Sequence, residues 1–208
     1  MPAVDPGQET LAHDVLALIS ALGASEAVLI GHDWGGASAV YGAAALRPDL
    51  VSKLMTVAIP HPATLKPSFR KVWGGARHFA TYKLPGAAKK RFARNDFAAL
   101  PAIYRRWSPT WNPPDSEFDA ARECFSSPGS LDAAFGYYRK LSPLPSASLR
   151  AKIAVPTVAF AGLDDPVAEP ADYRRARRMF FWTTIGLRKF RVGTSCIGNI
   201  RTCSPSEC

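Results

Sequence analysis

The sequence predicts an α/β fold, built on a mostly parallel sheet with helices on both faces. Short apolar runs at residues 27–30, 54–59 and 155–160 have the length and the flanking glycines and prolines of buried strands. Stretches with helical periodicity alternate with these runs. The strand, helix and strand within residues 27–59 form a βαβ unit, and the two strands of such a unit run parallel.

The first elements can be placed in order along the chain. Residues 9–22 carry apolar side chains at helical spacing, so we expect an amphipathic helix that ends at Gly23. After the first strand, an alanine-rich helix is expected over residues 36–46, where small side chains suit close packing against a sheet, and Pro48 ends it. The second strand is closed by Pro60.

The middle of the chain differs from the rest in composition and in the spacing of its prolines. Helical stretches rich in Arg and Lys alternate with proline breaks, which predicts a helical lid inserted into the fold. The core is expected to resume with the strand at 155–160 and a basic helix over 170–180, after which helical periodicity stops and only residues 189–192 resemble a strand. The predicted parts are a first part of the core, a helical lid, a second part of the core and an aberrant tail, at residues 1–61, 62–149, 150–180 and 181–208.

The turn after the first strand reads Gly31-His32-Asp33-Trp34-Gly35-Gly36. Its small-x-Asp-x-small spacing is that of a nucleophile elbow, a sharp strand-to-helix turn that presents a reactive side chain. The residue at the tip holds a strained backbone, and we expect the glycines on either side to prevent a collision. Asp33 would stand at the N-terminus of a helix, where negative charge is stabilised. The pattern suggests covalent catalysis by a carboxylate.

Composition limits the classes of function. The chain has 208 residues, enough for one domain with a sizeable core. Its formal net charge is +9, but no nucleic-acid-binding motif can be placed, so we expect a solvated basic surface and no nucleic-acid partner. We also expect no membrane segment, no signal peptide and a cytoplasmic location. The four cysteines have no zinc or redox spacing, so neither a metal nor a cofactor is predicted.

Three motifs together resemble the α/β-hydrolase superfamily: the elbow at residues 31–36, Ile59-Pro60-His61-Pro62, and Gly162-Leu163-Asp164-Asp165-Pro166. Within that superfamily, the chain is most similar to the epoxide hydrolase and haloalkane dehalogenase branch. The resemblance covers about residues 5–180. It implies a partial α/β-hydrolase fold with a helical lid, and a small apolar electrophile as the substrate.

The resemblance assigns roles to several core residues. Asp33 would attack a saturated carbon and form an alkyl ester on the enzyme. Asp165 would orient a histidine that activates water for hydrolysis of this ester, with Asp164 as the close alternative. The backbone N–H of Trp34, directly after the nucleophile, would be one oxyanion donor.

The resemblance also implies that lid side chains handle the leaving group. Tyr138, within Phe135-Gly136-Tyr137-Tyr138-Arg139, matches a family tyrosine that donates to the epoxide oxygen, whereas the second family position holds His78. Dehalogenases bind the halide through tryptophan N–H groups, and Trp34 could serve in this way. Epoxide opening is the leading interpretation, and haloalkane dehalogenation is the alternative.

The histidine that the family places after Asp165 is not found. The four histidines all precede it, at His13, His32, His61 and His78. Reading the codons of residues 181–208 one frame over permits a strand, a Gly-Gly-His-Phe loop and a closing helix, so a frameshift in this tail is our hypothesis. The upstream strands of the fold are not recognised either, which indicates a truncated chain. The sequence as written predicts impaired turnover, and a non-catalytic remnant of the fold is a further alternative.

Overall fold

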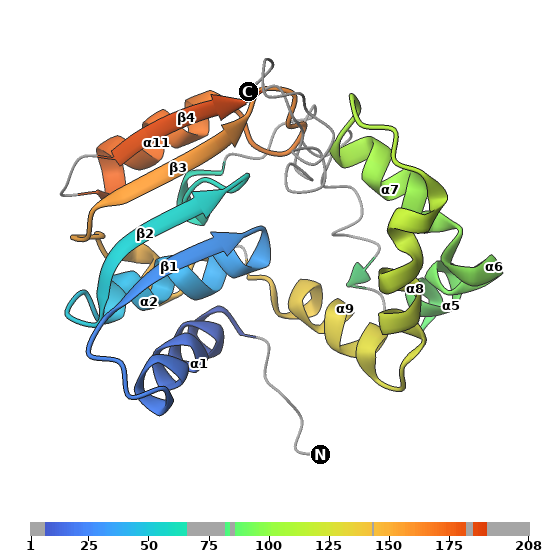
Figure 1. The fold of residues 1–208 in the computed structure, drawn as a ribbon, viewed down its shortest axis with the longest axis horizontal. Coiled ribbons are helices and arrows are strands. Elements are labelled where there is room, and N and C mark those ends of the chain that lie inside the picture. Colours follow the sequence, from blue (N-terminus) through green and yellow to red (C-terminus); the bar gives the residue numbers. More distant parts are fainter. Residues whose placement is uncertain (1–6, 66–81, 84–85, 143, 182–184, 191–208) are drawn as a thin grey trace.

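A computed structural model shows the α/β architecture that the sequence predicts (Figure 1). The structure describes residues 7–65, 82–83, 86–142, 144–181 and 185–190. The first lobe is a sheet with helices, and the second lobe, on the other side of Figure 1, consists of the helices between residues 87 and 140.

The sheet has four parallel strands in the order β1-β2-β3-β4. These strands are β1 (Ala27–His32), β2 (Val51–Val57), β3 (Thr157–Gly162) and β4 (Ile185–Phe190). The second strand begins three residues before its predicted start, and β4 lies within the segment that the sequence assigned to an aberrant tail. Parallel pairing with β3 overrides the weak local pattern of β4, because a neighbouring strand satisfies its backbone whatever its side chains are.

Helices cover one face of this sheet in the described part of the chain. Thr56 of β2 shares a hydrogen bond with Tyr41 of α2 (Tyr41–Leu46). Ala159, the register partner of Thr56, packs against Tyr173 of α11 (Pro170–Phe180), so both helices lie on the same face. The sequence predicted helices on both faces, but the described helices that pack on the sheet share this one.

The opposite face is comparatively bare at its β1 edge. Val28 and Ile30 point away from the helices and are 56% and 66% exposed. Leu29, between them, packs into the core beside α1 (Gln8–Ala21). Parallel sheets are normally covered on both sides, so this apolar face is unusual for an α/β sheet.

The core lies between the sheet and its helices. It gathers small and branched side chains of α2, β2 and the loops that flank them, including Val40, Ala44, Val51 and Leu54. α10 (Ala147–Arg150) contributes Leu149 to this core. The hydroxyl of Ser148, also in α10, donates a hydrogen bond to Glu9 of α1 at 2.7 Å. This bond ties the first helix to the segment that leads from the helical lobe back to the sheet.

The second lobe, called the helical lobe from here on, has its own aromatic core. Its elements are α5 (Ala87–Phe92), α6 (Arg94–Phe97), α7 (Ala99–Trp107), η4 (Asp115–Phe118), α8 (Asp119–Ser126) and α9 (Ser130–Lys140). Tyr82 stacks on Phe135 with ring centroids 4.6 Å apart, and Phe92 meets both Phe97 and Phe125 edge-on. Aromatic rings bury a large apolar area, which lets a lobe of short helices hold together.

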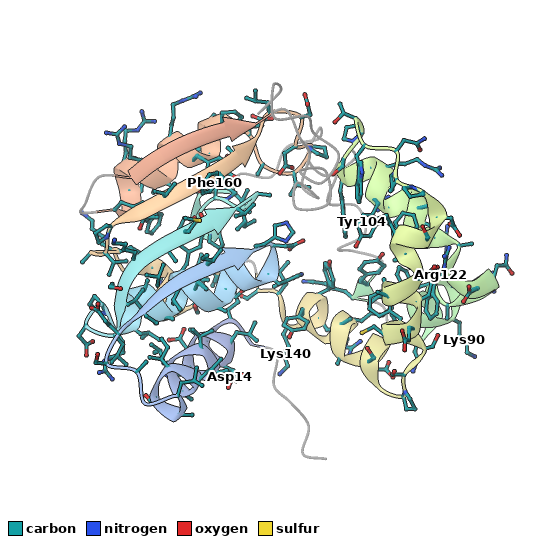
Figure 2. The ribbon with its side chains drawn as sticks, in the orientation of Figure 1. Asp14, Lys90, Tyr104, Arg122, Lys140 and Phe160 are labelled. Atoms are coloured by element: carbon teal, nitrogen blue, oxygen red, sulfur yellow. The ribbon has the colours of Figure 1, made fainter. Side chains whose placement is uncertain are left out.

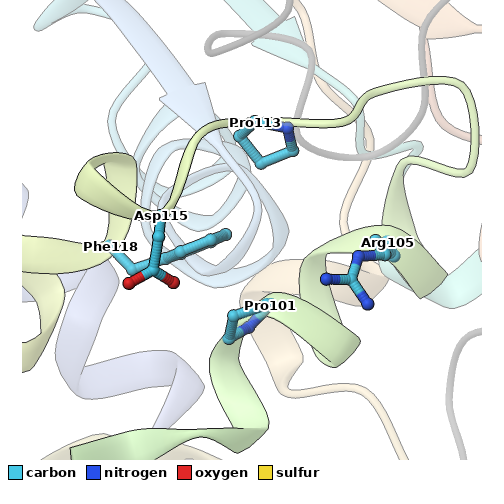
Figure 3. A pocket seen from close by; sticks show the side chains of 5 residues that line it. All are labelled: Pro101, Arg105, Pro113, Asp115 and Phe118. Carbon is cyan, nitrogen blue, oxygen red and sulfur yellow. The ribbon is translucent and has the colours of Figure 1, made fainter.

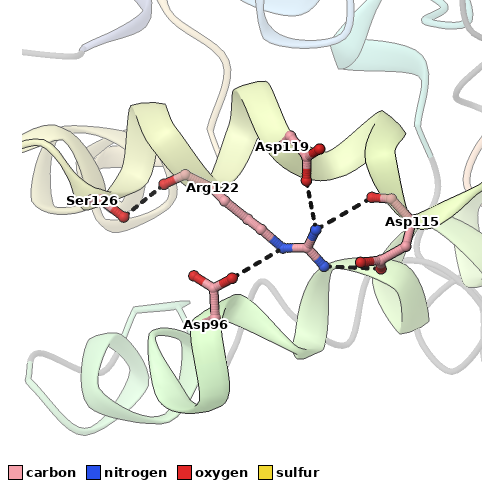
Figure 4. A network of polar contacts seen from close by, with 5 residues as sticks. All are labelled: Asp96, Asp115, Asp119, Arg122 and Ser126. Carbon is pink, nitrogen blue, oxygen red and sulfur yellow. Dashed lines mark hydrogen bonds and ion pairs between the residues drawn. The ribbon is translucent and has the colours of Figure 1, made fainter.

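Arg122 links three elements of this lobe (Figure 4). Its guanidinium donates to Asp119 Oδ1 and Asp115 Oδ1, both at 2.9 Å, and Nε lies 3.7 Å from Asp96 Oδ2. The three carboxylates are largely exposed, so each pair contributes little by itself, and the shared cation mainly fixes α6, η4 and α8 relative to one another.

No helix among the described residues is long and apolar enough to cross a membrane. Within the same residues, no group of His, Cys, Asp and Glu side chains is arranged to hold a metal ion.

Candidate active site

Asp33 lies at a sharp turn, as the spacing predicted. It directly follows β1, and its φ angle is 48°, in the left-handed region that a non-glycine residue rarely occupies. A short π-helix, η1 (Gly35–Val40), begins two residues later and continues into α2. Strained backbone of this kind persists only where the surrounding structure holds it, and it concentrates at functional sites.

Two glycines make the turn possible, and one of them is not the residue that the spacing predicted. A Cβ atom on Gly31 would lie 2.5 Å from Val40 Cγ2, and one on Gly36 would lie 2.3 Å from Ile59 Cγ2. A Cβ on Gly35 would meet no heavy atom of the described structure within 4 Å, so the expectation that Gly35 prevents a collision is wrong. The close approach comes from the loop after β2, which local spacing cannot reveal.

The loop after β2 also contacts α2, the helix into which η1 continues after the elbow. The Tyr41 hydroxyl, fully buried at the start of α2, donates to the Ile59 carbonyl at 3.2 Å and shares a 2.9 Å hydrogen bond with Thr56 Oγ1. Burial raises the pKa of this phenol, which therefore stays protonated and keeps its donor role.

Opposing effects act on the pKa of the Asp33 carboxyl group. Burial raises its pKa, because a desolvated carboxylate is disfavoured. The neighbouring His32 and a hydrogen bond from the backbone N–H of Trp34 act in the opposite direction. A desolvated carboxylate is a stronger nucleophile than a hydrated one, so this balance suits a reacting group. The Trp34 N–H, predicted as an oxyanion donor, contacts the Asp33 side chain in this structure.

The helical lobe reaches Asp33 through Trp34 and the tyrosines of α9. The Trp34 ring lies 5.3 Å from Tyr138 in an edge contact and 5.7 Å from Tyr137. The Trp34 indole N–H also hydrogen-bonds Tyr138. Burial raises the pKa of Tyr138, and the nearby negative charge of Asp33 raises it further. The structure thus places Tyr138 against Trp34 and within the electrostatic influence of Asp33.

Two more tyrosines of the helical lobe lie near this junction, and sequence reasoning missed both. The ring of Tyr82 is 5.0 Å from Tyr138 and is almost fully buried. Tyr104 of α7 is half-buried, and its pKa is raised by burial and by the charge of Asp33. Neither belongs to a motif. His78, predicted in this region, lies outside the described residues.

Asp165 is held in a different manner from Asp33. It follows β3 by three residues and is 4% exposed. Its Oδ1 atom accepts hydrogen bonds from the backbone N–H groups of Val167 at 2.7 Å and Ala168 at 3.1 Å. A side chain fixed by its own loop has one orientation, which suits an acid that positions a partner. Asp164, the alternative, is half-buried, and no described contact fixes it in this manner.

The three described histidines lie in different surroundings. His61 is fully buried and stacks on Phe180 with ring centroids 4.1 Å apart. Burial lowers its pKa to about 3, so it remains neutral and has a packing role. His13 is exposed on α1, and His32 flanks the elbow.

A cavity of about 150 Å³ lies within the helical lobe, away from the elbow (Figure 3). Its lining comes from α7, η4 and the loop between them: Pro101, Arg105, Pro113, Asp115 and Phe118. The chemistry-bearing side chains are at the strand ends, so we place the candidate active site at Asp33 and not in this cavity.

Comparison with known proteins identifies the family to which this fold belongs. The chain belongs to the alpha/beta hydrolase fold family, whose match covers residues 4–180. It is 28% identical over 169 residues to the AB hydrolase superfamily protein YfhM of Bacillus subtilis, covering 76% of this chain and 56% of the relative. It is also 28% identical over 172 residues to epoxide hydrolase 4 of Mus musculus, covering 77% of this chain and 46% of the relative. The chain thus spans about half the length of the curated relatives it matches.

Solved structures support the same fold. An epoxide hydrolase from Bacillus megaterium superposes with a TM-score of 0.70 and 18% identity, over 97% of this chain and 77% of that one. Cfl2 from Burkholderia cenocepacia gives a TM-score of 0.70 at 21% identity, over 97% of this chain and 73% of that one. The predicted resemblance to the epoxide hydrolase-like branch of the α/β hydrolases is therefore confirmed.

Proposed function

We propose that this chain carries the residues for the first step of an epoxide-opening α/β hydrolase, in which the enzyme is alkylated, and that Asp33 is the nucleophile. The observation that supports this most strongly is the left-handed backbone of Asp33 directly after β1, in a turn where Gly31 and Gly36 are closely packed. An aspartate suits attack on saturated carbon, because the ester that it forms can later be hydrolysed at the aspartyl carbonyl.

The proposed step breaks one bond and forms one. An Asp33 oxygen bonds to an epoxide carbon, and the ring C–O bond breaks with its electron pair going to the oxygen. Tyr138 donates a hydrogen bond to that oxygen and then its proton, and solvent reprotonates the phenolate. The raised pKa of Tyr138 keeps the proton in place until the more basic alkoxide develops.

The helical lobe acts as the lid in this proposal. Trp34, Tyr137 and Tyr138 present aromatic faces at the junction between the lobe and the elbow. Such walls favour a small apolar electrophile, since they bury its carbon skeleton and leave the phenols to meet its oxygen. The reaction written above needs no cofactor and no metal. Neither a membrane nor a nucleic acid takes part, and the cytoplasm suits a reaction of this kind.

Asp165 belongs to the second step, hydrolysis of the ester. It would orient a histidine that activates water, and no histidine follows His78 in the sequence. We therefore expect the chain as written to accumulate the ester and to release little diol.

The test is to incubate the chain with styrene oxide and follow its intact mass over time. The proposal predicts one adduct that the Asp33→Ala variant lacks, with little diol in the supernatant. Subtracting the Asp33→Ala spectrum removes adducts on the four cysteines. Rapid diol release, or equal labelling of both proteins, would contradict the proposal.

Haloalkane dehalogenation is the second candidate, because Trp34, the residue directly after Asp33, carries an indole N–H group that could bind a halide. That N–H hydrogen-bonds Tyr138, which favours an oxygen leaving group whose donor is the phenol. Halide release from 1-bromobutane without any reaction of epoxides would reverse this preference. High-affinity binding of apolar ligands with no adduct would instead favour the non-catalytic remnant.

A further inference from the structure

The cavity in the helical lobe combines apolar walls with two opposite charges. Its volume of about 150 Å³ is the size of a protein cavity that holds a single benzene ring. Phe118, Pro101 and Pro113 supply its apolar surface, and Arg105 and Asp115 are its charged residues. In Figure 3, Arg105 and Asp115 lie on opposite sides of this space, with Pro101 between them. The proposed reaction at the elbow uses none of these side chains.

The apolar walls of the cavity are fixed before any ligand arrives. Proline rings lock the backbone φ angle, so Pro101, in the first turn of α7, and Pro113, in the following loop, have little freedom. Phe118 is 2% exposed, and its ring meets Tyr104 edge-on at 5.1 Å and lies 5.9 Å from the Cζ atom of Arg122. Figure 2 labels both of these neighbours within the helical lobe. Binding would therefore cost little free energy for ordering these walls.

Asp115 gives one side of the cavity a negative charge of fixed orientation. Arg122 donates to Asp115 Oδ1 at 2.9 Å and to the Asp115 backbone oxygen at 3.3 Å. The Oδ2 atom accepts no hydrogen bond from the part of the chain that the structure describes. The same guanidinium also pairs with Asp96 and Asp119, so one cation is shared by three carboxylates and the group keeps a net negative charge. This side of the cavity thus attracts a cationic group.

Arg105 gives the opposite side of the cavity a positive charge. It is exposed on α7, and among the described residues it forms neither a hydrogen bond nor an ion pair. A guanidinium presents its N–H donors in a planar fork that matches the two oxygens of a carboxylate. An anionic group can therefore pair with Arg105 without first displacing a protein partner.

We propose that this cavity binds a small zwitterion whose carboxylate and ammonium groups stand at opposite ends of an apolar ring or chain. The carboxylate pairs with Arg105, the ammonium pairs with Asp115, and the apolar middle of the ligand packs on Phe118. An α-amino acid carries both charges at one end and does not match this arrangement. The site is separate from Asp33 and does not depend on the proposed function.

The probe is 4-(aminomethyl)benzoate, and benzoate and benzylamine each keep the ring with one of its two charges. Ligand-observed NMR titration gives the three affinities for the unmodified chain and its variants. Arg105→Gln should weaken binding of the zwitterion and of benzoate by about 10-fold and leave benzylamine unchanged. Asp115→Asn should weaken binding of the zwitterion and of benzylamine by about the same factor and leave benzoate unchanged.

Asp119→Asn is the matched control, because Asp119 also accepts from Arg122 at 2.9 Å but does not line the cavity. This variant should keep all three affinities, and so should Asp33→Ala. Equal losses in Asp115→Asn and Asp119→Asn would overturn the inference, since they would come from loosening of the lobe. Absence of saturable zwitterion binding to the unmodified chain, or its loss in Asp33→Ala, would also overturn the site in the cavity.

Discussion

Asp33 and Asp165 both follow the carboxyl ends of parallel strands, β1 and β3, but their backbone conformations and hydrogen bonds differ. Asp33 sits on a left-handed backbone at 48°, beside aromatic rings that come from another lobe. Asp165 sits in a relaxed turn where its own loop donates two hydrogen bonds to Oδ1. In the proposed mechanism, the strained turn presents Asp33 for reaction, whereas hydrogen bonds from its own loop hold Asp165 in one orientation. Both residues are aspartates, so the different roles that we propose for them follow from their surroundings.

The largest effect should come from removing the first carboxylate. Asp33→Ala leaves no group at the tip of the turn to attack an electrophile, so labelling at this position should vanish. Tryptic peptide mapping after incubation with styrene oxide measures this. If the variant is still labelled within the same peptide, another nucleophile performs the chemistry and the contrast between the two aspartates is mistaken.

Tyr138→Phe should slow epoxide labelling of Asp33 by about 100-fold, because one preorganised donor to the developing alkoxide is lost. The ring remains, so its contact with Trp34 is kept. The rate of adduct formation by intact mass spectrometry provides the measurement. A rate equal to that of the unmodified chain would remove Tyr138 from the reaction.

The two glycines next to the elbow should respond differently to the same substitution. Gly36→Ala places a Cβ against Ile59 and should lower the free energy of unfolding by about 1–3 kcal/mol, or Tm by about 2–10 °C. Gly35→Ala adds the same atom in open space and should leave Tm unchanged within about 2 °C. Thermal unfolding by circular dichroism compares them, and equal shifts would argue against the tight Gly36–Ile59 approach.

The rate of Asp33 labelling should rise with pH over a range above the ordinary titration of an aspartate. Only the carboxylate attacks, and burial raises the pKa of Asp33, so the reactive form appears at higher pH than in a solvated aspartate. By linkage, the ionised Asp33 destabilises the fold above the ordinary aspartate pKa, so Asp33→Ala should be more stable than the unmodified chain at neutral pH and lose this advantage in acid. Labelling rates and urea midpoints measured across pH check both statements.

The smallest effect should come from the second carboxylate. Asp165→Asn keeps an oxygen that can accept from Val167 and Ala168, so we expect a loss of unfolding free energy of about 1 kcal/mol or less. Epoxide labelling of Asp33 should be unchanged, because Asp165 serves the later step. A large fall in labelling would show that both aspartates act together in the first step.

The sequence predicted the elbow because the motif is local. A strand, a turn of small residues and a helix follow one another within a few positions, and short-range sterics suffice to place Asp33. The same local reasoning selected Gly35, and it failed because the atom that restricts the turn belongs to Ile59, on the next loop. Close approaches between separate segments leave no trace in residue spacing.

The tyrosines show the same limit more strongly. Tyr138 was found through its family motif, whereas Tyr104 and Tyr82 belong to no motif that the sequence analysis recognised. Their relation to Asp33 and Tyr138 depends on how α7 and α9 fold against the elbow. β4 was predicted poorly for a related reason, since pairing with β3 and not its own side chains makes it a strand.

The most direct measurement is the location of the epoxide adduct by tandem mass spectrometry of the labelled chain. The account predicts a mass increase on Asp33, within the peptide that also contains His32 and Trp34. An increase confined to Cys124 or another exposed nucleophile, with Asp33 unmodified, would contradict it.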